Sequence, residues 1–301
     1  LTAKINAATY NLYTSDSPSP FSPGLDTPSS FQPPVVSRTV VTLKALNTNA
    51  SPAGWINDGV NETRGNNVDA HLDRNDDDLP DLPRTQGSPN RNFNFPLDLS
   101  LSPTSYGDAA VVNLFYWNNF AHDKLYELGF TEAFGNFQGT NFGRGGFGGD
   151  AVMADGQDGG GFNNANFSTP PDGYPGRMQM YIFDGPTPDR DGDLDSEVML
   201  HEYTHGLSNR LLGGGDGIFN LQPAGMGEGW SDFYAMCLLS EPTDDPHANY
   251  ATGGYATRNF YGLSANYYFG IRRYPYSTDM NKNPLTLKDI DPTQADPHAG
   301  I

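Results

Sequence analysis

The sequence contains a single cysteine, Cys237, in 301 residues. No disulfide can therefore form within the chain, and we do not expect thiol chemistry. Cys237 lies in the apolar run of residues 233–239, which predicts a buried side chain that acts as a small hydrophobic group. An exported protein without disulfides needs other stabilising ties, and bound calcium is a candidate for that role.

Basic residues are also scarce, since 17 Lys and Arg stand against 36 Asp and Glu and give a formal net charge of −19. Nucleic acids and anionic membranes are bound through Lys and Arg, so we expect neither as a partner. No apolar run approaches the roughly 20 residues that are needed to span a bilayer.

Charged residues make up only 18% of the chain, whereas glycine (35) and proline (24) are abundant, which predicts many turns and loops. The length allows a sizeable core and fits one large domain or two lobes around a cleft. The first residue is Leu1 and no signal peptide is present, so we expect a processed or excised piece.

The first strong helical pattern covers residues 108–128, where apolar side chains recur near a period of 3.6 and Gly129 is placed to end the helix. His122 and Asp123 lie on this helix. They could take part in a metal or catalytic site, or His122 could be a packed histidine that is bonded to its neighbours.

A second helix is predicted over residues 196–211, with Asp195 as its N-cap. It carries the pattern His201-Glu202-x-x-His205. Side chains four apart lie on the same face of a helix, so both imidazoles can bind one zinc ion, and Glu202 can reach the water that such an ion holds.

A catalytic zinc keeps three protein ligands and leaves its fourth position for water or substrate. The third ligand is predicted to be Glu228, which lies 27 positions after the first histidine. Asp232 follows four residues later on the same helical face. It can accept the free ring N–H of a ligand histidine, or it can be an exposed helix carboxylate.

These motifs, HEYTHGLSNRL at residues 201–211 and GMGEGWSDF at residues 225–233, resemble the fungalysin family of secreted zinc endopeptidases, relatives of the thermolysin-like enzymes. The resemblance extends over about residues 52–301. Further similar stretches are residues 64–68, 115–123, 163–167, 177–183 and 270–279.

The resemblance implies an extracellular endopeptidase that cleaves extended polypeptides, with His201, His205 and Glu228 as zinc ligands. Glu202 would take a proton from the zinc-bound water and pass it to the departing amine. The family is made with a leader and an inhibitory propeptide, and we expect a monomer.

The expected fold is α+β, with the two lobes of a zincin of thermolysin-like type. Residues 1–195 would form a β-rich lobe with long loops and one long helix. Residues 196–301 would form a mainly helical lobe, incomplete because the family fold continues beyond it, with zinc between the lobes.

Residues 35–46 and 177–183 are predicted to form strands, and residues 163–167 an edge strand beside the cleft. An exposed edge can pair with an extended peptide, although an ordinary loop is the alternative for residues 163–167. By resemblance, Asn164 and Ala165 would hold the substrate backbone.

An oxyanion donor is also expected, and His298 is the candidate by resemblance; a frayed terminal histidine is the alternative. Further cleft candidates are Arg272, Arg273 and Tyr276, although strand or loop packing explains them equally well.

Two acidic segments could bind calcium. Residues 73–81 hold five acidic side chains, and Asp73, Asn75, Asp77 and Asp81 could supply oxygen ligands, unless the segment is a disordered acidic loop. The Asp spacing of residues 189–195 resembles part of a calcium loop, but a solvated turn with a helix cap fits it better.

A function of another class is a secreted, calcium-stabilised binding module with a vestigial or structural zinc site. Against it, Glu202 would have no purpose in a closed structural site, which needs a fourth ligand rather than a base.

Overall fold

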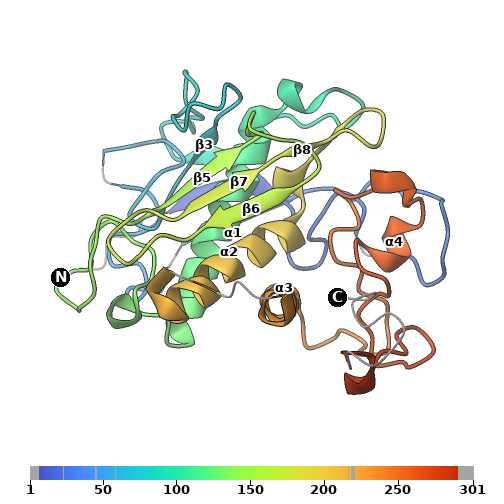
Figure 1. The fold of residues 1–301 in the computed structure, drawn as a ribbon. Helices are drawn as coiled ribbons and strands as arrows, with labels where there is room; N and C mark the ends of the chain where they lie inside the picture. Colours follow the sequence, from blue (N-terminus) through green and yellow to red (C-terminus); the bar gives the residue numbers. More distant parts are fainter. Residues whose placement is uncertain are drawn as a thin grey trace.

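The computed structural model describes residues 7–290, except residues 23, 45, 58, 216 and 218–220. This part of the chain is a mixed α/β fold (Figure 1). All of its strands precede residue 192, and three of its four α-helices follow residue 195. None of the described helices combines the length and the apolar character that would be needed to cross a membrane.

The central sheet has four strands in the order β3-β5-β7-β6. Strands β3 (Val68–Leu72), β5 (Val152–Gly156) and β7 (Arg177–Met180) run parallel, and β6 (Ala165–Ser168) runs antiparallel to β7. Alternate apolar side chains of these strands are buried. Because β6 is the last strand in this order, its other side is an edge of the sheet. The edge strand predicted at residues 163–167 is therefore present, but it covers residues 165–168.

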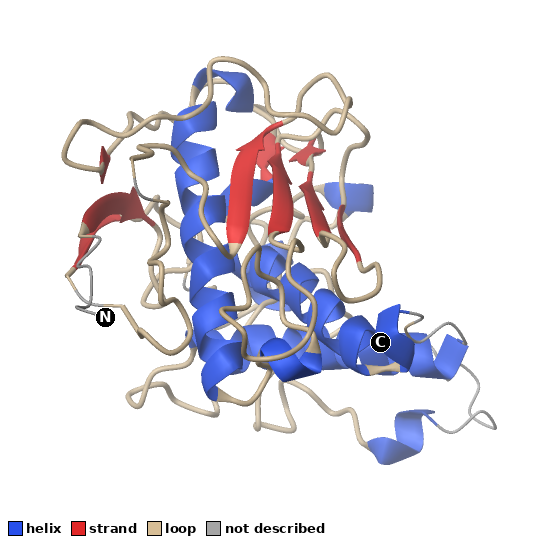
Figure 2. Ribbon diagram, turned by 90° about the vertical axis from the view of Figure 1, so that its left-hand side faces the viewer, coloured by secondary structure: helices blue, strands red, loops and turns tan. Residues whose placement is uncertain are grey.

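Helix α1 (Gly107–Glu127) lies along one face of this sheet (Figure 2). Its bounds agree with the prediction to within one residue, and Gly129 follows it with a φ of 110°. Side chains on several sides of α1 are buried, among them Phe115, Trp117 and Leu125. The helix is therefore part of the core rather than a surface layer.

A second sheet has the order β2-β1-β4. Strand β1 (Ala8–Leu12) pairs antiparallel with β2 (Thr39–Leu43) and parallel with β4 (Asn92–Phe93). The ring of Tyr10 stacks on that of Phe93 with 5.5 Å between centroids. The strand predicted at residues 35–46 is therefore present, but it is shorter.

The strand predicted at residues 177–183 is divided in two. After β7 the chain leaves the central sheet at Tyr181, and β8 (Ile182–Phe183) pairs with β9 (Arg190–Asp191) instead. The remaining elements are α2 (Ser196–Leu211), α3 (Leu221–Leu239), α4 (Asn266–Phe269) and the short 3-10 helices η1 (Pro103–Ser105), η2 (Glu132–Phe134), η3 (Gly192–Leu194), η4 (Gly213–Gly215), η5 (Phe260–Gly262) and η6 (Leu287–Ile290). Helix α2 has the predicted bounds.

His122 is a packed histidine. It is buried, its Nδ1 lies 3.0 Å from Oδ1 of Asp123, and its Nε2 lies 3.2 Å from Oε1 of Gln138.

The prediction for Cys237 was wrong, because this side chain is exposed. Cys237 lies on α3, a helix that also leaves Trp230 and Phe233 exposed, so an apolar run did not ensure burial.

Candidate metal centre

Helix α2 brings the two predicted histidines together. The Nε2 atoms of His201 and His205 lie 3.0 Å apart. A neutral imidazole carries a proton on only one of its two nitrogens, so the other nitrogen can bind a metal ion. His201 is buried, and His205 is partly exposed towards a cavity. Two ring nitrogens that face each other at this distance present their lone pairs to a common point.

Helix α3 supplies the third member of the group. The carboxylate oxygens of Glu228 lie 3.2 Å from Nε2 of His201 and 3.3 Å from Nε2 of His205. Ligands about 2.05 Å from a zinc ion in tetrahedral geometry are about 3.3 Å from one another. The three donor atoms therefore have the spacing and the chemistry that fit one zinc ion, and no fourth His, Cys, Asp or Glu of the described residues joins them.

Asp232 lies behind the histidine rather than at the metal position. Its Oδ1 is 2.7 Å from Nδ1 of His201. Arg272 donates to both oxygens of this carboxylate, from Nε at 2.6 Å and from Nη2 at 2.8 Å, and Tyr276 donates its hydroxyl at 2.7 Å. The carboxylate is thus fixed from three directions, and it fixes the ring of His201 in turn.

The electrostatics of the group favour a positive charge. Burial lowers the pKa of His201, but hydrogen bonds with Asp232 and Glu228 outweigh this effect and raise it to about 9. The two imidazoles hold the pKa of Glu228 well below its usual range. Burial raises the pKa of Asp232, but His201 and Arg272 bring it down to about 2. Both carboxylates are therefore ionised at neutral pH.

Glu202 lies in the wall of a cavity of about 390 Å³ that also contains the two histidines and Glu228. Burial raises the pKa of its carboxyl, and the nearby imidazoles lower it by less. Such a raised pKa suits a group that takes up and later releases a proton.

The edge strand forms another wall of the same cavity, since Asn164 and Ala165 line it together with His201 and Glu202. Gly206 allows this arrangement. A Cβ added there would lie 2.6 Å from the ring of Phe167 on β6, so a larger residue could not pack α2 this closely against the strand.

Both ends of α2 are tied to other parts of the chain. At the start, Asp195 occupies the N-cap and its Oδ2 accepts from the backbone N–H of Ala256 at 3.2 Å. Near the end, Nη1 of Arg210 donates to Oδ2 of Asp150 at 2.8 Å, and both side chains are buried. These contacts hold α2, which carries two of the three candidate ligands, at a fixed position.

The family of this chain follows from its similarity to known protein families. The model of the fungalysin metallopeptidase family (M36) matches residues 27–300. This chain belongs to the fungalysin metallopeptidase family.

Three similar relatives carry names of the same kind. Probable extracellular metalloproteinase 2 of Arthroderma benhamiae is 42% identical over 276 residues, which is 90% of this chain and 42% of the relative. Extracellular metalloproteinase mep of Aspergillus niger is 44% identical over 261 residues, with 84% and 40% covered. Extracellular metalloproteinase 1 of Trichophyton rubrum is 43% identical over 259 residues, also with 84% and 40% covered. The chain thus spans about two fifths of the length of these relatives.

A second group of acidic side chains lies in this fungalysin chain away from the histidines. Buried Asp73, Asp155 and Asp158 place carboxylate oxygens within 4.8 Å of one another. Of the four residues predicted as calcium ligands, only Asp73 belongs to this group. Asn75 donates from its side chain to Asp77 at 2.9 Å, and Asp81 accepts from the backbone of Arg74 at 3.4 Å.

Asp155 and Asp158 were not predicted as members of this group, although the sequence contained a signal for them. Asp73 directly follows β3, and Asp155 lies near the end of β5, the parallel neighbour of β3. The carboxyl ends of neighbouring parallel strands lie side by side, but using this signal requires knowing which strands are neighbours.

His298, the predicted oxyanion donor, lies outside the described residues.

Proposed function

We propose that this chain is the metal-binding part of an extracellular zinc endopeptidase that hydrolyses peptide bonds of extended polypeptides. One observation carries the proposal: two imidazoles and a carboxylate converge at 3.0 to 3.3 Å beside a buried glutamate in a cavity. The extracellular setting is supported by the names of the relatives.

His201, His205 and Glu228 would hold the zinc ion, and Asp232 would keep Nδ1 of His201 protonated so that Nε2 faces the ion. A bound zinc ion supplies Lewis acidity, which polarises a carbonyl and makes water a stronger acid. Glu202 accepts the proton of the attacking water on its carboxylate and later delivers it to the leaving amine.

The substrate would lie as an added strand along β6. Ala165 and Asn166 pair with β7 on one side only, so the other side of the backbone can bond to an extended peptide. Asn164 and Ala165 would make these contacts, because both line the cavity. His298 would donate to the developing oxyanion.

The wider setting is proposed by family resemblance. The protein would be made with a leader and an inhibitory propeptide and would act as a monomer. Residues 1–195 and 196–301 would form the two lobes, with the metal between them.

The test uses the full-length protein with Glu202→Gln. Casein hydrolysis should fall by about 10² to 10⁴, because the general base is lost, while zinc per molecule stays at the wild-type value. Phenanthroline should abolish wild-type activity. A matched control is Glu127→Gln, the same change on the exposed end of α1. Wild-type protein that binds zinc but cleaves no polypeptide would contradict the proposal and leave a binding module.

We also propose calcium as a stabilising ion at Asp73, with Asp155 and Asp158 as its neighbours. Burial raises the pKa of Asp73 and of Asp158, and the neighbouring charge of Asp155 raises both further, so these carboxylates repel one another when they are ionised. His71 and Arg177 bond to Asp155 and offset part of this charge. Calcium added to zinc-loaded, calcium-free protein should raise the melting temperature by several degrees. Asp158→Asn should reduce this rise, and an unchanged melting temperature in the wild type would exclude the site.

A further inference from the structure

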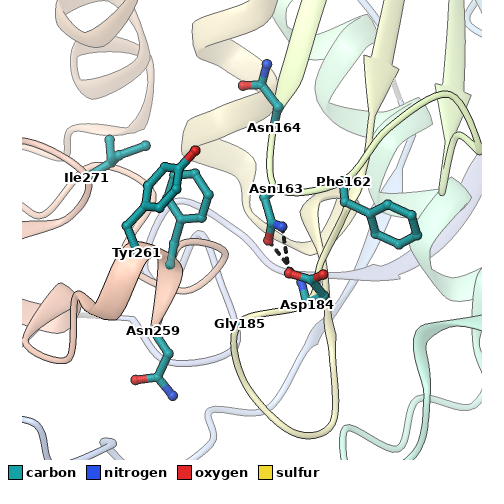
Figure 3. A pocket seen from close by; sticks show the side chains of 9 residues that line it. Phe162, Asn163, Asn164, Asp184, Gly185, Asn259, Tyr261 and Ile271 are labelled. Carbon is teal, nitrogen blue, oxygen red and sulfur yellow. Dashed lines mark hydrogen bonds between the residues drawn. The ribbon is translucent and has the colours of Figure 1, made fainter.

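A second cavity of about 600 Å³ opens beside the candidate catalytic cavity (Figure 3). Asn163, Asn164 and Ile271 line both. The two spaces are therefore neighbours along the start of the edge strand. A polypeptide that lies along β6 with its scissile bond at the metal centre can place another of its side chains in this second cavity.

The cavity has two walls of different origin. Tyr261 and Ile271 lie on one side, whereas Asn163 and Asp184 lie on the other, near the start of β6 and the end of β8 (Figure 3). Tyr261 is 90% exposed, and its ring centroid is 4.2 Å from that of Phe260. Tyr261 and Ile271 thus give one side of the cavity aromatic and aliphatic surface, whereas Asn163 and Asp184 give the other side polar groups beside the ring of Phe162.

Asp184 carries the only charge among the nine residues that line the cavity. Its Oδ1 accepts from Nδ2 of Asn163 at 2.6 Å, and its backbone N–H donates to Oδ1 of Asn163 at 3.0 Å. The first bond holds the carboxylate, and the second holds the backbone that carries it. They leave the other carboxylate oxygen available to a positively charged group.

The backbone of the walls is unusual as well. Asn163, Asn259 and Tyr261 have φ values of 59°, 59° and 47°. This left-handed region is unfavourable for a side chain as large as tyrosine, and such conformations cluster at ligand sites. In this conformation the ring of Tyr261 remains in the wall, where it can contact a ligand.

We propose that this cavity binds a Lys or Arg side chain of the substrate and that Asp184 determines this specificity. The inference rests on the proposed function. The methylene stem of the side chain would lie along Ile271, and its charge would contact the Asp184 carboxylate and the face of Tyr261. The net charge of −19 attracts basic polypeptides in addition.

Cleavage-site profiling of a protein digest tests the proposal. Wild-type, full-length protein should show Lys and Arg enriched at one fixed position relative to the cut bond. Peptide pairs that differ only by Lys or norleucine at that position should differ about twofold to fivefold in kcat/KM, the size expected for a partly exposed ion pair. Asp184→Asn should remove this difference, and Asp184→Lys should favour Glu there.

Asp189→Asn is the matched control, because it removes the same charge from an exposed position that does not line the cavity. This variant should keep the wild-type ratio. The side chains of Asp184 and Asp189 are both exposed, so the melting temperatures of Asp184→Asn and Asp189→Asn should match that of the wild type. A wild-type digest without a basic preference, or a preference that persists in Asp184→Asn, would overturn the inference. Neither result would contradict the proposed peptidase function. That function is contradicted only if zinc-loaded wild-type protein cleaves no polypeptide.

Discussion

Oδ1 of Asp232 lies 2.7 Å from Nδ1 of His201. This contact places a proton on Nδ1 and leaves Nε2 as the nitrogen that can bind a metal ion, at the point where Glu228 and His205 also converge. The contact joins α3 to α2, so the same two helices that supply the three donor atoms also supply the group that orients one of them.

Asp232→Asn should therefore weaken zinc binding by about tenfold to a hundredfold. The amide has almost the same shape, but it carries no charge and can no longer pair with Arg272. A competition titration with a chromophoric chelator measures the change. Asp279→Asn, at a partly exposed position that does not line the cavity, should leave the affinity unchanged. An Asp232→Asn protein with wild-type zinc affinity would show that the contact does not tune the ligand.

The buried pair Arg210 and Asp150 predicts a stability effect. Arg210→Met should cost about 3 to 5 kcal/mol in the free energy of unfolding, because it leaves the carboxylate of Asp150 buried without its partner. Adding Asp150→Asn to Arg210→Met should restore much of this loss. Denaturant unfolding at constant zinc concentration measures both. Equal losses in the single and the double variant would show that lost packing, not charge, is responsible.

Replacing a glycine by alanine should change the stability of the protein in opposite directions on α2 and on α3. Gly206→Ala should destabilise the protein by about 1 to 3 kcal/mol, since the added methyl would overlap the ring of Phe167. Gly229→Ala on α3 meets nothing within 4 Å and should stabilise it by about 0.5 to 1 kcal/mol through helix propensity. Thermal unfolding distinguishes the two. Stabilisation by Gly206→Ala would show that α2 and β6 can separate without cost.

Much of the candidate centre could be predicted because its signals are local. The spacing of His201 and His205 places them on one helical face, and the bounds of α2 follow from a cap and a periodic pattern. The division of residues 177–183 could not be predicted, because it depends on the pairing of β8 with β9. The approach of Asp73 to Asp155 depends in the same way on strand neighbours that no local pattern specifies.

The N-cap of α2 predicts a pH dependence. Burial raises the pKa of Asp195 from its ordinary value of 3.8 to about 6, although backbone N–H groups, that of Ala256 among them, lower it in part. Between these two values the unfolded chain loses the proton while the folded chain keeps it. The stability that the neutral carboxyl contributes is therefore complete below about pH 4 and is lost as the pH rises through about 6.

Asp195→Asn cannot ionise, so the wild type should lose stability relative to this variant between pH 4 and 7, by roughly 3 kcal/mol at most. The measurement is the difference between their free energies of unfolding across this range. Other titrating groups largely cancel in this difference. Glu197 is the exception, because Asp195 contributes to its raised pKa and removal of that charge acts in the same direction. A difference that is constant with pH, or one that favours the wild type as the pH rises, would show that the folded protein holds Asp195 ionised throughout.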